Sequence, residues 1–419
     1  MLKRALPILM LLMLLGPCAA VAQISYCATH PEKVACTFSS LYTFPVGNNQ
    51  VASPQPDPFS AIAASVGSQL AQLPLASPAS GIIYNVDPVL GVETPSNETF
   101  GPVFAERGET IGRGKFFVAA TYQRFSFSSI DGIDMKNLPT VFSICGSTNT
   151  CTTFGTTNRV DLKVNQFALF ASFGLTSRLD VSVAVPILDV KLGASVTGCA
   201  PVTVGSSCVL PPITGVGVLA ITPGAFISHG ATGLGDIVVR GKGQIVKGEH
   251  YRLAVGLDVR LPTGDELNLL GTGAVGFKPF IAFSRRGRLS PHANVGYQWN
   301  GDSNLGGSEV GASGRLPEDL TYNGGFDFRV AKRLTLAADF LGDHITNARR
   351  MKVGEVPISG GTAPSAFLVN GSYASAKGAL GVKINPFGNL LVTANIEQRF
   401  DHNGLRNRFV PLVGASYTF

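Results

Sequence analysis

A hydroxyl and imidazole pair, Ser290 and His292, and a glycine pattern, GTGAVG at 271–276, are residues whose types and spacing could perform chemistry. Residues two apart share one face of a strand, so a serine and a histidine at this spacing could act as nucleophile and base. The glycine pattern matches the G-x-G-x-x-G of dinucleotide sites, which needs a strand before it and a helix after it. Here a strand pattern follows the glycines, so the match predicts no cofactor.

Two acid–base neighbours, Asp343–His344 and Asp401–His402, fall near predicted strand ends. Adjacent strand residues point to opposite faces, so neither pair forms a ready dyad. Ser290 and His292 would lie beside the short turn RGR (286–288). If the chain forms an outer-membrane barrel, that turn is at the periplasmic end, away from any outer-leaflet substrate. The sequence also lacks H-E-x-x-H, G-x-S-x-G and P-loop motifs. We therefore predict no enzymatic activity, no cofactor and no metal ion.

Cysteine usage indicates an oxidising compartment. Beyond the first 22 residues, six cysteines fall into three local pairs, and no C-x-x-C occurs. Six cysteines allow 15 connectivities, of which short loops between sequence neighbours are the simplest set. Disulfides persist in the bacterial periplasm and at the cell surface. The predicted structural pairs are Cys27/Cys36, Cys145/Cys151 and Cys199/Cys208.

The N-terminus has the pattern of a secretory signal. Two basic residues precede a short apolar run, and Ala20-Val21-Ala22 offers small residues for cleavage, which predicts a signal peptide over 1–22. A lipoprotein signal at Cys18 is the alternative, but Pro17 before that cysteine fits it poorly. Removing the two basic residues lowers the formal charge from +6 to +4. So mild a basic excess gives no support for nucleic-acid binding.

The composition disfavours an ordinary soluble domain. Charged residues make up 14% of the chain, against about 25% in typical soluble domains, and hydrophobic residues make up 45%. Even the most apolar later stretch, 211–227, is broken by prolines and glycines, so no transmembrane helix is predicted. Two solutions remain: a large soluble all-β core, or a barrel that closes its backbone hydrogen bonds strand to strand in lipid.

Apolar and polar residues alternate with period two from residue 115 onward. In YRLAVGLDVRL (251–261), for example, an unbroken apolar face opposes Arg252, Asp258 and Arg260. Five short turns alternate with six long loops, which predicts an all-β, up-and-down antiparallel transmembrane barrel of about twelve strands with both termini periplasmic. The predicted strands are 115–128, 160–174, 179–192, 234–246, 251–262, 276–285, 289–299, 319–330, 334–344, 373–384, 390–400 and 409–419.

The polar faces of these strands are predicted to line the lumen. Cross-strand salt bridges could fill and rigidify a narrow barrel, or the charges could form a wet, mildly anion-favouring path, and both can hold at once. The lumen-lining candidates are Arg240, Lys242, Arg252, Asp258, Arg260, Lys278, Asp327, Arg329, Glu397 and Arg399.

The last strand ends on an aromatic residue. Val413, Ala415, Tyr417 and Phe419 occupy alternate positions, so all four are predicted to face outer-membrane lipid, with an aromatic at the membrane boundary. This pattern resembles the C-terminal signature that the barrel assembly machinery of outer membranes reads. Outer-membrane lipid and that machinery are therefore the predicted partners, besides a solute that the sequence does not name.

Five stretches carry a family resemblance: FGPVFAERGETIGRGKFFVAATYQRF (100–125), TGLGDIVVRGKGQ (232–244), VGLDVRLPTGDELNLLGTG (255–273), PHANVGYQW (291–299) and GGFDFRVAKRLTLAADFLGD (324–343). They resemble the phenol meta-pathway (MetA-pathway) family of outer-membrane transporters, which is loosely akin to the fatty-acid and aromatic-hydrocarbon channel group. The resemblance covers about residues 100–419. It implies a barrel in the bacterial outer membrane and the uptake of apolar or aromatic compounds. A structural or surface-interaction barrel without transport is the alternative.

Residues 23–114 differ from the predicted barrel, 115–419. They are rich in proline and show one helical pattern, with Ile62, Val66, Leu70 and Leu73 on one face. A disordered periplasmic tether and a lumen plug both fit this composition. The Cys27/Cys36 loop favours order, and channels in the related group use an N-terminal hatch, so the resemblance implies a plug that enters from the periplasmic side.

Overall fold

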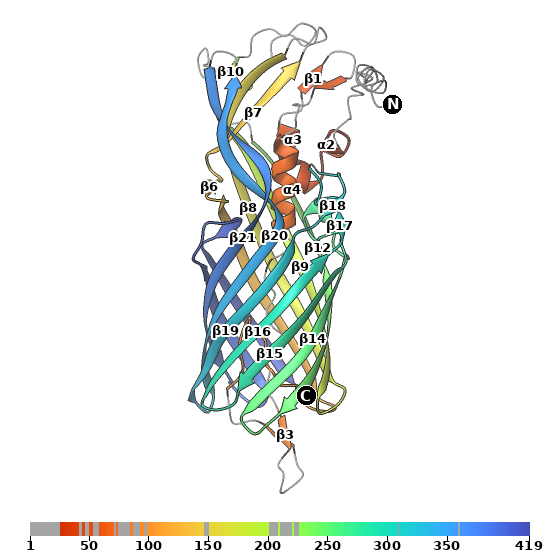
Figure 1. Cartoon of the computed structure of the whole chain (residues 1–419), viewed down its shortest axis with the longest axis vertical. Helices are drawn as coiled ribbons and strands as arrows, with labels where there is room; N and C mark the ends of the chain where they lie inside the picture. The colour runs from red at the N-terminus through yellow and green to blue at the C-terminus, as the bar shows by residue number, and fades with distance from the viewer. Residues whose placement is uncertain are drawn as a thin grey trace, which may run out of the picture.

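Twelve antiparallel strands form a closed barrel (Figure 1). The first, β5 (Phe116–Ile130), pairs with the last, β24 (Phe409–Thr418), and this pairing closes the sheet. Four short strands join the same 16-stranded sheet outside the circuit. The other barrel strands are β8 (Cys151–Gly174), β9 (Leu179–Ala200), β13 (Ile237–Lys247), β14 (Tyr251–Leu261), β15 (Gly276–Arg285), β16 (Leu289–Asn300), β19 (Glu318–Ala331), β20 (Leu334–Ile358), β21 (Gly361–Ile384) and β22 (Leu390–Arg399).

The computed structural model describes residues 26–41, 44–46, 50–52, 58–70, 73, 84–86, 93–95, 99–145, 151–200, 208–209, 220–221, 226–308, 310–358 and 361–419. The predicted signal peptide, 1–22, lies outside these residues. The short elements are α2 (Tyr26–Thr29), η1 (Val34–Cys36), α3 (Thr37–Leu41), β1 (Phe44–Val46), β2 (Gln50–Ala52), α4 (Pro58–Leu70), β3 (Tyr84–Val86), β4 (Glu93–Pro95), β6 (Ile133–Asp134), β7 (Leu138–Cys145), β10 (Cys208–Val209), β11 (Ala220–Ile221), β12 (Phe226–Leu234), η2 (Glu266–Asn268), β17 (Asp302–Ser303), β18 (Gly314–Arg315) and β23 (Leu405–Asn407).

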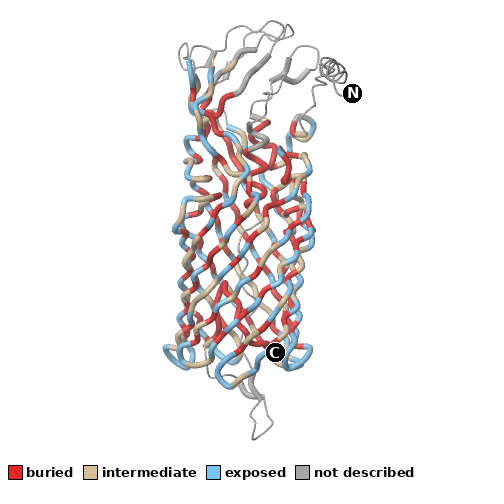
Figure 2. Tube along the Cα trace, viewed as in Figure 1, coloured by how far each residue is buried: buried red, intermediate tan, exposed pale blue. Residues whose placement is uncertain are grey.

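The outer face of the barrel is apolar. Buried and exposed residues alternate along the strands (Figure 2), and the exposed ones include Leu289, Leu380 and Val413. A closed barrel with an apolar outer face has no unpaired strand edge and matches the hydrocarbon of a bilayer. Such barrels lie in bacterial outer membranes, with short turns on the periplasmic side. The predicted fold class and location are confirmed.

Four strands are longer than predicted. The strand predicted over 334–344 continues to Ile358 as β20, and its partner β21 begins at Gly361 rather than at 373. β8 and β9 extend in the same way, while β7 and β12 form inside segments predicted as long loops. Backbone pairing needs no lipid-facing side chains once a strand has left the membrane. The alternation therefore fades in the sequence although the hairpins continue.

The N-terminal helices lie at the end of the barrel opposite Phe419 (Figure 1). We expected residues 23–114 to form either a tether on the periplasmic side, where both termini of the barrel lie, or a plug that enters the lumen from that side. Helix α4 accounts for the predicted helical pattern, and it packs on β20 and β21, whereas α3 packs on β9 and β12. The upper parts of these strands, beyond the membrane, provide the apolar surface that the helices need. No helix in the described part of the chain is long and apolar enough to cross a membrane.

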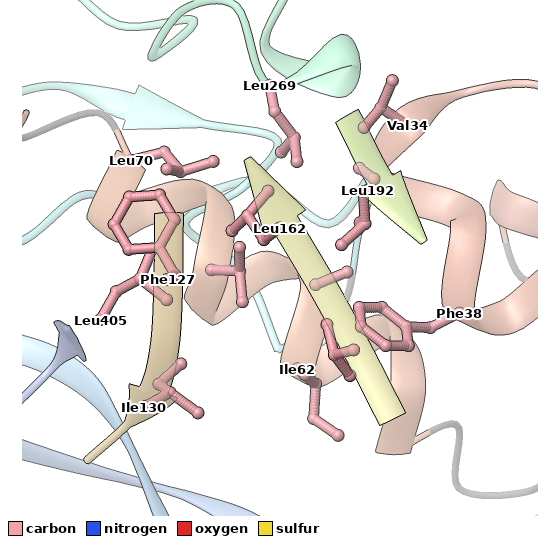
Figure 3. Packing of buried hydrophobic residues seen from close by; sticks show 14 of the residues in the cluster. Val34, Phe38, Ile62, Leu70, Phe127, Ile130, Leu162, Leu192, Leu269 and Leu405 are labelled. Atoms are coloured by element: carbon pink, nitrogen blue, oxygen red, sulfur yellow. The ribbon is translucent and has the colours of Figure 1, made fainter. Parts of the chain in front are cut away.

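A hydrophobic core joins these helices to the strands (Figure 3). Val34 and Phe38 come from η1 and α3, and Ile62 comes from α4; all three side chains are almost completely buried. They pack with Leu162 of β8 and Leu192 of β9, in the part of the barrel farthest from the short turns. The core therefore fixes the N-terminal helices over this end of the lumen.

A disulfide joins Cys27 to Cys36, with their Cα atoms 5.1 Å apart. The first predicted pair is thereby confirmed. It links α2 to η1 within the hydrophobic core, since both cysteines are buried. Cys199 is also disulfide-bonded. The predicted cysteines whose side chains fall outside the described residues are Cys145, Cys151 and Cys208.

Candidate functional site

The strands turn their charged side chains into the lumen. Lys242 on β13 and Asp258 on β14 are buried inside the barrel, whereas Val239 and Leu257 on the same strands are exposed on its outer face. Period-two alternation produces this division, because successive side chains of a strand point to opposite faces. The lumen is therefore lined by polar and ionic groups contributed by every part of the wall.

Residues 99–114, which we call the inner segment, lie inside the lumen and lead directly into β5. Several of their backbone N–H groups donate to side chains of the wall, and only at the end of the segment does Gly114 N–H donate to a strand backbone, that of Gly174 on β8. Glu106 N–H donates to Asn294 Oδ1 at 2.9 Å, and Ile111 N–H donates to Asp180 Oδ2 at 2.9 Å. On the carbonyl side, Lys383 Nζ donates to Pro102 O at 2.7 Å. The irregular backbone is thus satisfied inside the barrel, as a buried chain requires.

Gly108 shows how closely the inner segment approaches the wall. A Cβ atom at this position would lie 2.6 Å from the backbone oxygen of Arg252 on β14. Gly108 N–H donates to Ser284 Oγ at 3.0 Å, and its carbonyl accepts from Gln244 Nε2 at 2.8 Å. Only glycine fits this contact without moving the wall, because any other residue would add an atom there.

Glu106 is the centre of an ionic network at mid-lumen. Its carboxylate contacts the guanidinium of Arg240 and lies 2.9 Å from Lys242 Nζ. Arg240 also donates to both oxygens of Asp258, at 2.6 and 2.7 Å, and its guanidinium lies 4.9 Å from the ring centroid of Phe280. Burying these charges is costly unless each is paired, and here each has a partner. The network attaches the inner segment to β13.

A second attachment point is Asp339 on β20. Its Oδ2 accepts from the N–H groups of Val103 and Phe104 at 3.3 and 3.2 Å, while its Oδ1 lies 2.7 Å from His292 Nε2. His292 is thereby engaged in holding a structural carboxylate. Ser290 Oγ instead donates to a turn carbonyl. The serine and the histidine therefore do not form the nucleophile–base pair that their spacing allows.

A cavity of about 240 Å³ lies in the lumen beside the inner segment. Leu73 lines it from the side of the N-terminal helices, and Phe104 and Glu106 line it from the inner segment. Apolar and polar side chains both line it, often from the same strand, so the cavity is amphipathic. The apolar lining includes Phe170, Ala184, Val238, Phe280 and Leu341, and the polar lining includes Lys278, Asn294, Gln298, Asn300, Asp319, Thr321 and Asn323.

The other predicted lumen residues lie in three places. Arg240, Asp258, Arg260 and Lys278 line the cavity, and Arg260 donates to Asn300 Oδ1 at 2.6 Å. The predicted lumen residues that lie nearer the short turns include Asp327, whose Oδ2 lies 3.6 Å from His292 Nδ1. Arg252 is buried beside Gly108, Arg329 is half-buried, and Glu397 and Arg399 line a small cavity farther from the short turns, where Arg399 donates to Leu405 O at 2.6 Å.

The four C-terminal signature residues share the outer face of β24. Val413 and Phe419 are among the most exposed apolar side chains in the described structure, and Phe419 lies beside Tyr417 and near Phe116 of the neighbouring strand. Ala415 is on the same face, opposite Ala120 of β5. The aromatic end of the chain therefore lies at the barrel seam, on the short-turn side.

Several residues of the site could not be found by alternation alone. Glu106 and Phe104 belong to a stretch with no period, and Asn294 and Thr321 are uncharged. The available signal was the run GPVFAERGETIGRG (101–114), which has two acids and two arginines among glycines directly before a strand. Within the described chain, no group of three or more His, Cys, Asp or Glu side chains could hold a metal ion.

The family comparison gives one match. Residues 148–344 match the family described as "Putative MetA-pathway of phenol degradation". The match confirms the resemblance predicted from the sequence over this part of the chain, which runs from β8 to β20. No curated protein matches the chain.

Three solved structures illustrate what the fold is similar to. An outer membrane channel from Pseudomonas putida F1 has 13% identity and a TM-score of 0.46, covering 74% of this chain and 98% of the channel. A FadL homologue from Pseudomonas aeruginosa has 9% identity and a TM-score of 0.31, covering 73% and 89%. OmpF of Salmonella typhi has 9% identity and a TM-score of 0.29, covering 73% and 98%.

Proposed function

We propose that the protein is an outer-membrane channel for small solutes with an apolar or aromatic body. The amphipathic cavity inside the barrel carries this proposal, because it offers apolar and polar side chains to the same molecule. Its volume, about 240 Å³, suits a small molecule. The aromatic rings of Phe104, Phe170 and Phe280 would contact the apolar body, and the amides and charges opposite would contact a polar group.

Passage through the lumen would require the inner segment to move. Between residues 100 and 111, most of its attachments are hydrogen bonds and ion pairs to side chains of the wall, so they can be exchanged one at a time for water or for solute, whereas Gly114 N–H already donates to the backbone of β8. The apolar solute class is supported by the rings of the cavity and by the matched family, whose description names phenol degradation. The small volume of the cavity, about 240 Å³, disfavours the passage of large solutes.

Filling the cavity tests the proposal. Ala184 lines the cavity and is 7% exposed. We expect Ala184→Trp to lower uptake of small aromatic solutes into proteoliposomes at least about tenfold, because an indole would occupy much of the cavity. Ala120→Trp, on the outer face of β5, is the matched control and should leave uptake unchanged. Equal uptake by the two variants would contradict a route through this cavity.

A second candidate function is a surface-interaction barrel that transports nothing. The observation that favours it is the length of the β8–β9 and β20–β21 hairpins, which continue beyond the barrel and join β7 there. Such hairpins would present backbone and side chains to other cells or to polysaccharide. Proteoliposomes with the unaltered protein decide between the two: if no small solute enters faster than into empty vesicles, the surface role is preferred.

A further inference from the structure

Three cations gather on the outer face of neighbouring strands, and we call them the outer cation cluster: Arg124 on β5, Lys163 on β8 and Lys191 on β9. All three are exposed, and they point away from the lumen. Lys163 and Lys191 are direct partners in the register of β8 and β9. Arg124 is opposite Asn165, one outward-facing position from Lys163 along the same strand. One group bound on the wall could contact all three.

The cluster begins where the apolar band ends. The row directly beneath it, on the side of the short turns, is entirely apolar or aromatic and exposed. Two residues farther along the strands, about 7 Å by the rise of a strand, the outer face is polar, with Arg124, Asn165 and Asp189 at this level. Lys163 and Lys191 follow another two residues on. This is the level at which the hydrocarbon of a bilayer gives way to headgroups, on the side away from the periplasm. The apolar row consists of Val413, Tyr122, Phe167, Ile187 and Leu234.

The two lysines face each other without sufficient counter-charge. Like charges directly opposite across a strand pair are destabilising. Lys191 has Asp189 at 3.7 Å, but that carboxylate already accepts from Asn165 at 3.0 Å and from Thr232 at 3.0 Å. Within the described residues, Lys163 makes no hydrogen bond or ion pair. An external anion between the two ammonium groups would remove the repulsion.

The wall around the cluster is open. Gly230 of β12 is opposite Lys191, and Ser126 of β5 is opposite Lys163, so the neighbours are small. Lys191 is correspondingly exposed, at 68% of its side chain. A bulky anionic group could therefore reach the cations from outside without moving any side chain of the wall.

We propose that the outer cation cluster binds the phosphate groups of a phosphorylated glycolipid in the outer leaflet, while the apolar row beneath it contacts the acyl chains. Phosphate accepts hydrogen bonds from Lys and Arg together, and charge-assisted bonds of this kind are among the strongest in proteins. Basic clusters at a membrane surface attract anionic headgroups in the same way. The site thus has the two parts, cationic and apolar, that such a lipid has.

The opposite wall of the barrel differs at the same boundary. β15 and β16 present Phe277, Tyr297 and Trp299 outward, with the rings of Tyr297 and Trp299 packed 4.9 Å apart. Aromatic rings of this kind form the usual girdle of a membrane barrel and require no specific lipid. The cations on β5, β8 and β9 are therefore a local feature of one side, and the lipid would bind at that side.

Lipid binding to purified, folded barrel in detergent tests the proposal. The probes are a bisphosphorylated lipid A and its dephosphorylated form, with native mass spectrometry as the readout. We expect saturable binding of the phosphorylated lipid, weakened at least about tenfold by the triple change Arg124→Gln, Lys163→Gln and Lys191→Gln. The matched control is Lys332→Gln, an exposed lysine in the short β19–β20 turn, which should bind as the unaltered protein does.

Three outcomes would overturn the proposal: undiminished binding by the triple variant, equal binding of the dephosphorylated lipid, or full competition by pyrophosphate at the lipid's concentration. The last would assign the cations to a free anion. Conversely, retention of binding by Lys163→Arg with Lys191→Arg would support a requirement for charge at these positions. Heat-modifiable gel mobility checks that each variant is folded, which all should be because the altered side chains are exposed.

Discussion

Glu106 holds the inner segment by charge at the middle of the lumen. A carboxylate buried between Arg240 and Lys242 would be unstable without both, and the two cations would equally be unstable without it. The ion pair between Arg240 and Asp258 balances the second positive charge of the network. Position 106 therefore controls how firmly the inner segment is attached to the wall.

Neutralising this carboxylate should release the inner segment more often. A hydrogen bond to a charged group contributes about 1.5–3 kcal/mol, so Glu106→Gln should raise the open fraction at least about tenfold. Planar-bilayer recordings would show this as more frequent large openings. Glu249→Gln, in the exposed β13–β14 turn, is the matched control. Identical opening frequencies in the two variants would show that the network does not limit conduction.

At the scale of elements, a salt bridge ties the N-terminal helices to an outer loop. Lys33 Nζ lies 3.0 Å from Asp265 Oδ2, and Asp265 also accepts from the backbone of η2. Burial would raise the pKa of Asp265, but hydrogen bonds from Lys33 and Asn268 outweigh it and hold the pKa below its usual value. The hydrogen bond to Asp265 raises the pKa of Lys33.

The direction of these pKa shifts predicts the pH range in which the salt bridge between Lys33 and Asp265 is lost. A carboxyl group with a lowered pKa stabilises the folded state above its unfolded pKa of about 3.9, and that contribution is lost as pH falls through the lowered value. Residues 26–41 should thus keep constant hydrogen-exchange protection, corrected for intrinsic rates, between about pH 5 and 8, and lose some below about pH 4. Asp265→Asn should remove the acid-dependent step, whereas Asp302→Asn, at an exposed position of β17, should retain it. An unchanged acid step in Asp265→Asn would assign the effect to another group.

The sequence was sufficient to predict the barrel strands but not the inner segment, for a physical reason. Side-chain polarity alternates along each strand because lipid lies on one side of the wall and a polar lumen on the other. The period of two is therefore visible in the sequence of every spanning strand. The inner segment meets no such boundary. Its backbone bonds to side chains of distant strands, such as Asp180 and Asp339, and no local period records those partners.

The position of the N-terminal helices could not be predicted for a related reason. Because β5 begins at the periplasmic end of the seam, we expected residues 23–114 to be a tether on that side or a plug that enters the lumen from it. The apolar faces of the N-terminal helices instead pack against Leu162 and Leu192 at the other end of the barrel. A helix pattern in a sequence indicates which face must be buried, and it contains no information on which surface will bury it.

At the scale of the whole molecule, the seam between β5 and β24 carries the C-terminal aromatic residue. Phe419 is 62% exposed and touches the rings of Tyr417 and Phe116. So exposed a side chain contributes little to the stability of the finished barrel. We therefore propose that its main role is recognition by the barrel assembly machinery.

Two measurements separate recognition from stability. Phe419→Ala should lower the amount of folded barrel in outer membranes severalfold, while refolding of purified protein from urea into detergent should be nearly unaffected. Val413→Ala, on the same face of the same strand and also exposed, should assemble normally. If Phe419→Ala refolds as poorly from urea as it assembles in cells, the residue acts in the seam and not through the machinery.

The inner segment also sets an order of events for the newly made chain. It ends at residue 114, and β5 begins two residues later, yet the partner that closes the wall beside β5 is β24, the last strand to be synthesised. The segment can settle among its partners freely while that gap is open. Once the final strand has paired with the first, the segment can enter only through an open end of the barrel. If the last strand paired with the first before the inner segment had docked, the barrel would close around an empty lumen. The rate of seam closure, relative to docking, therefore decides whether the finished barrel contains the inner segment.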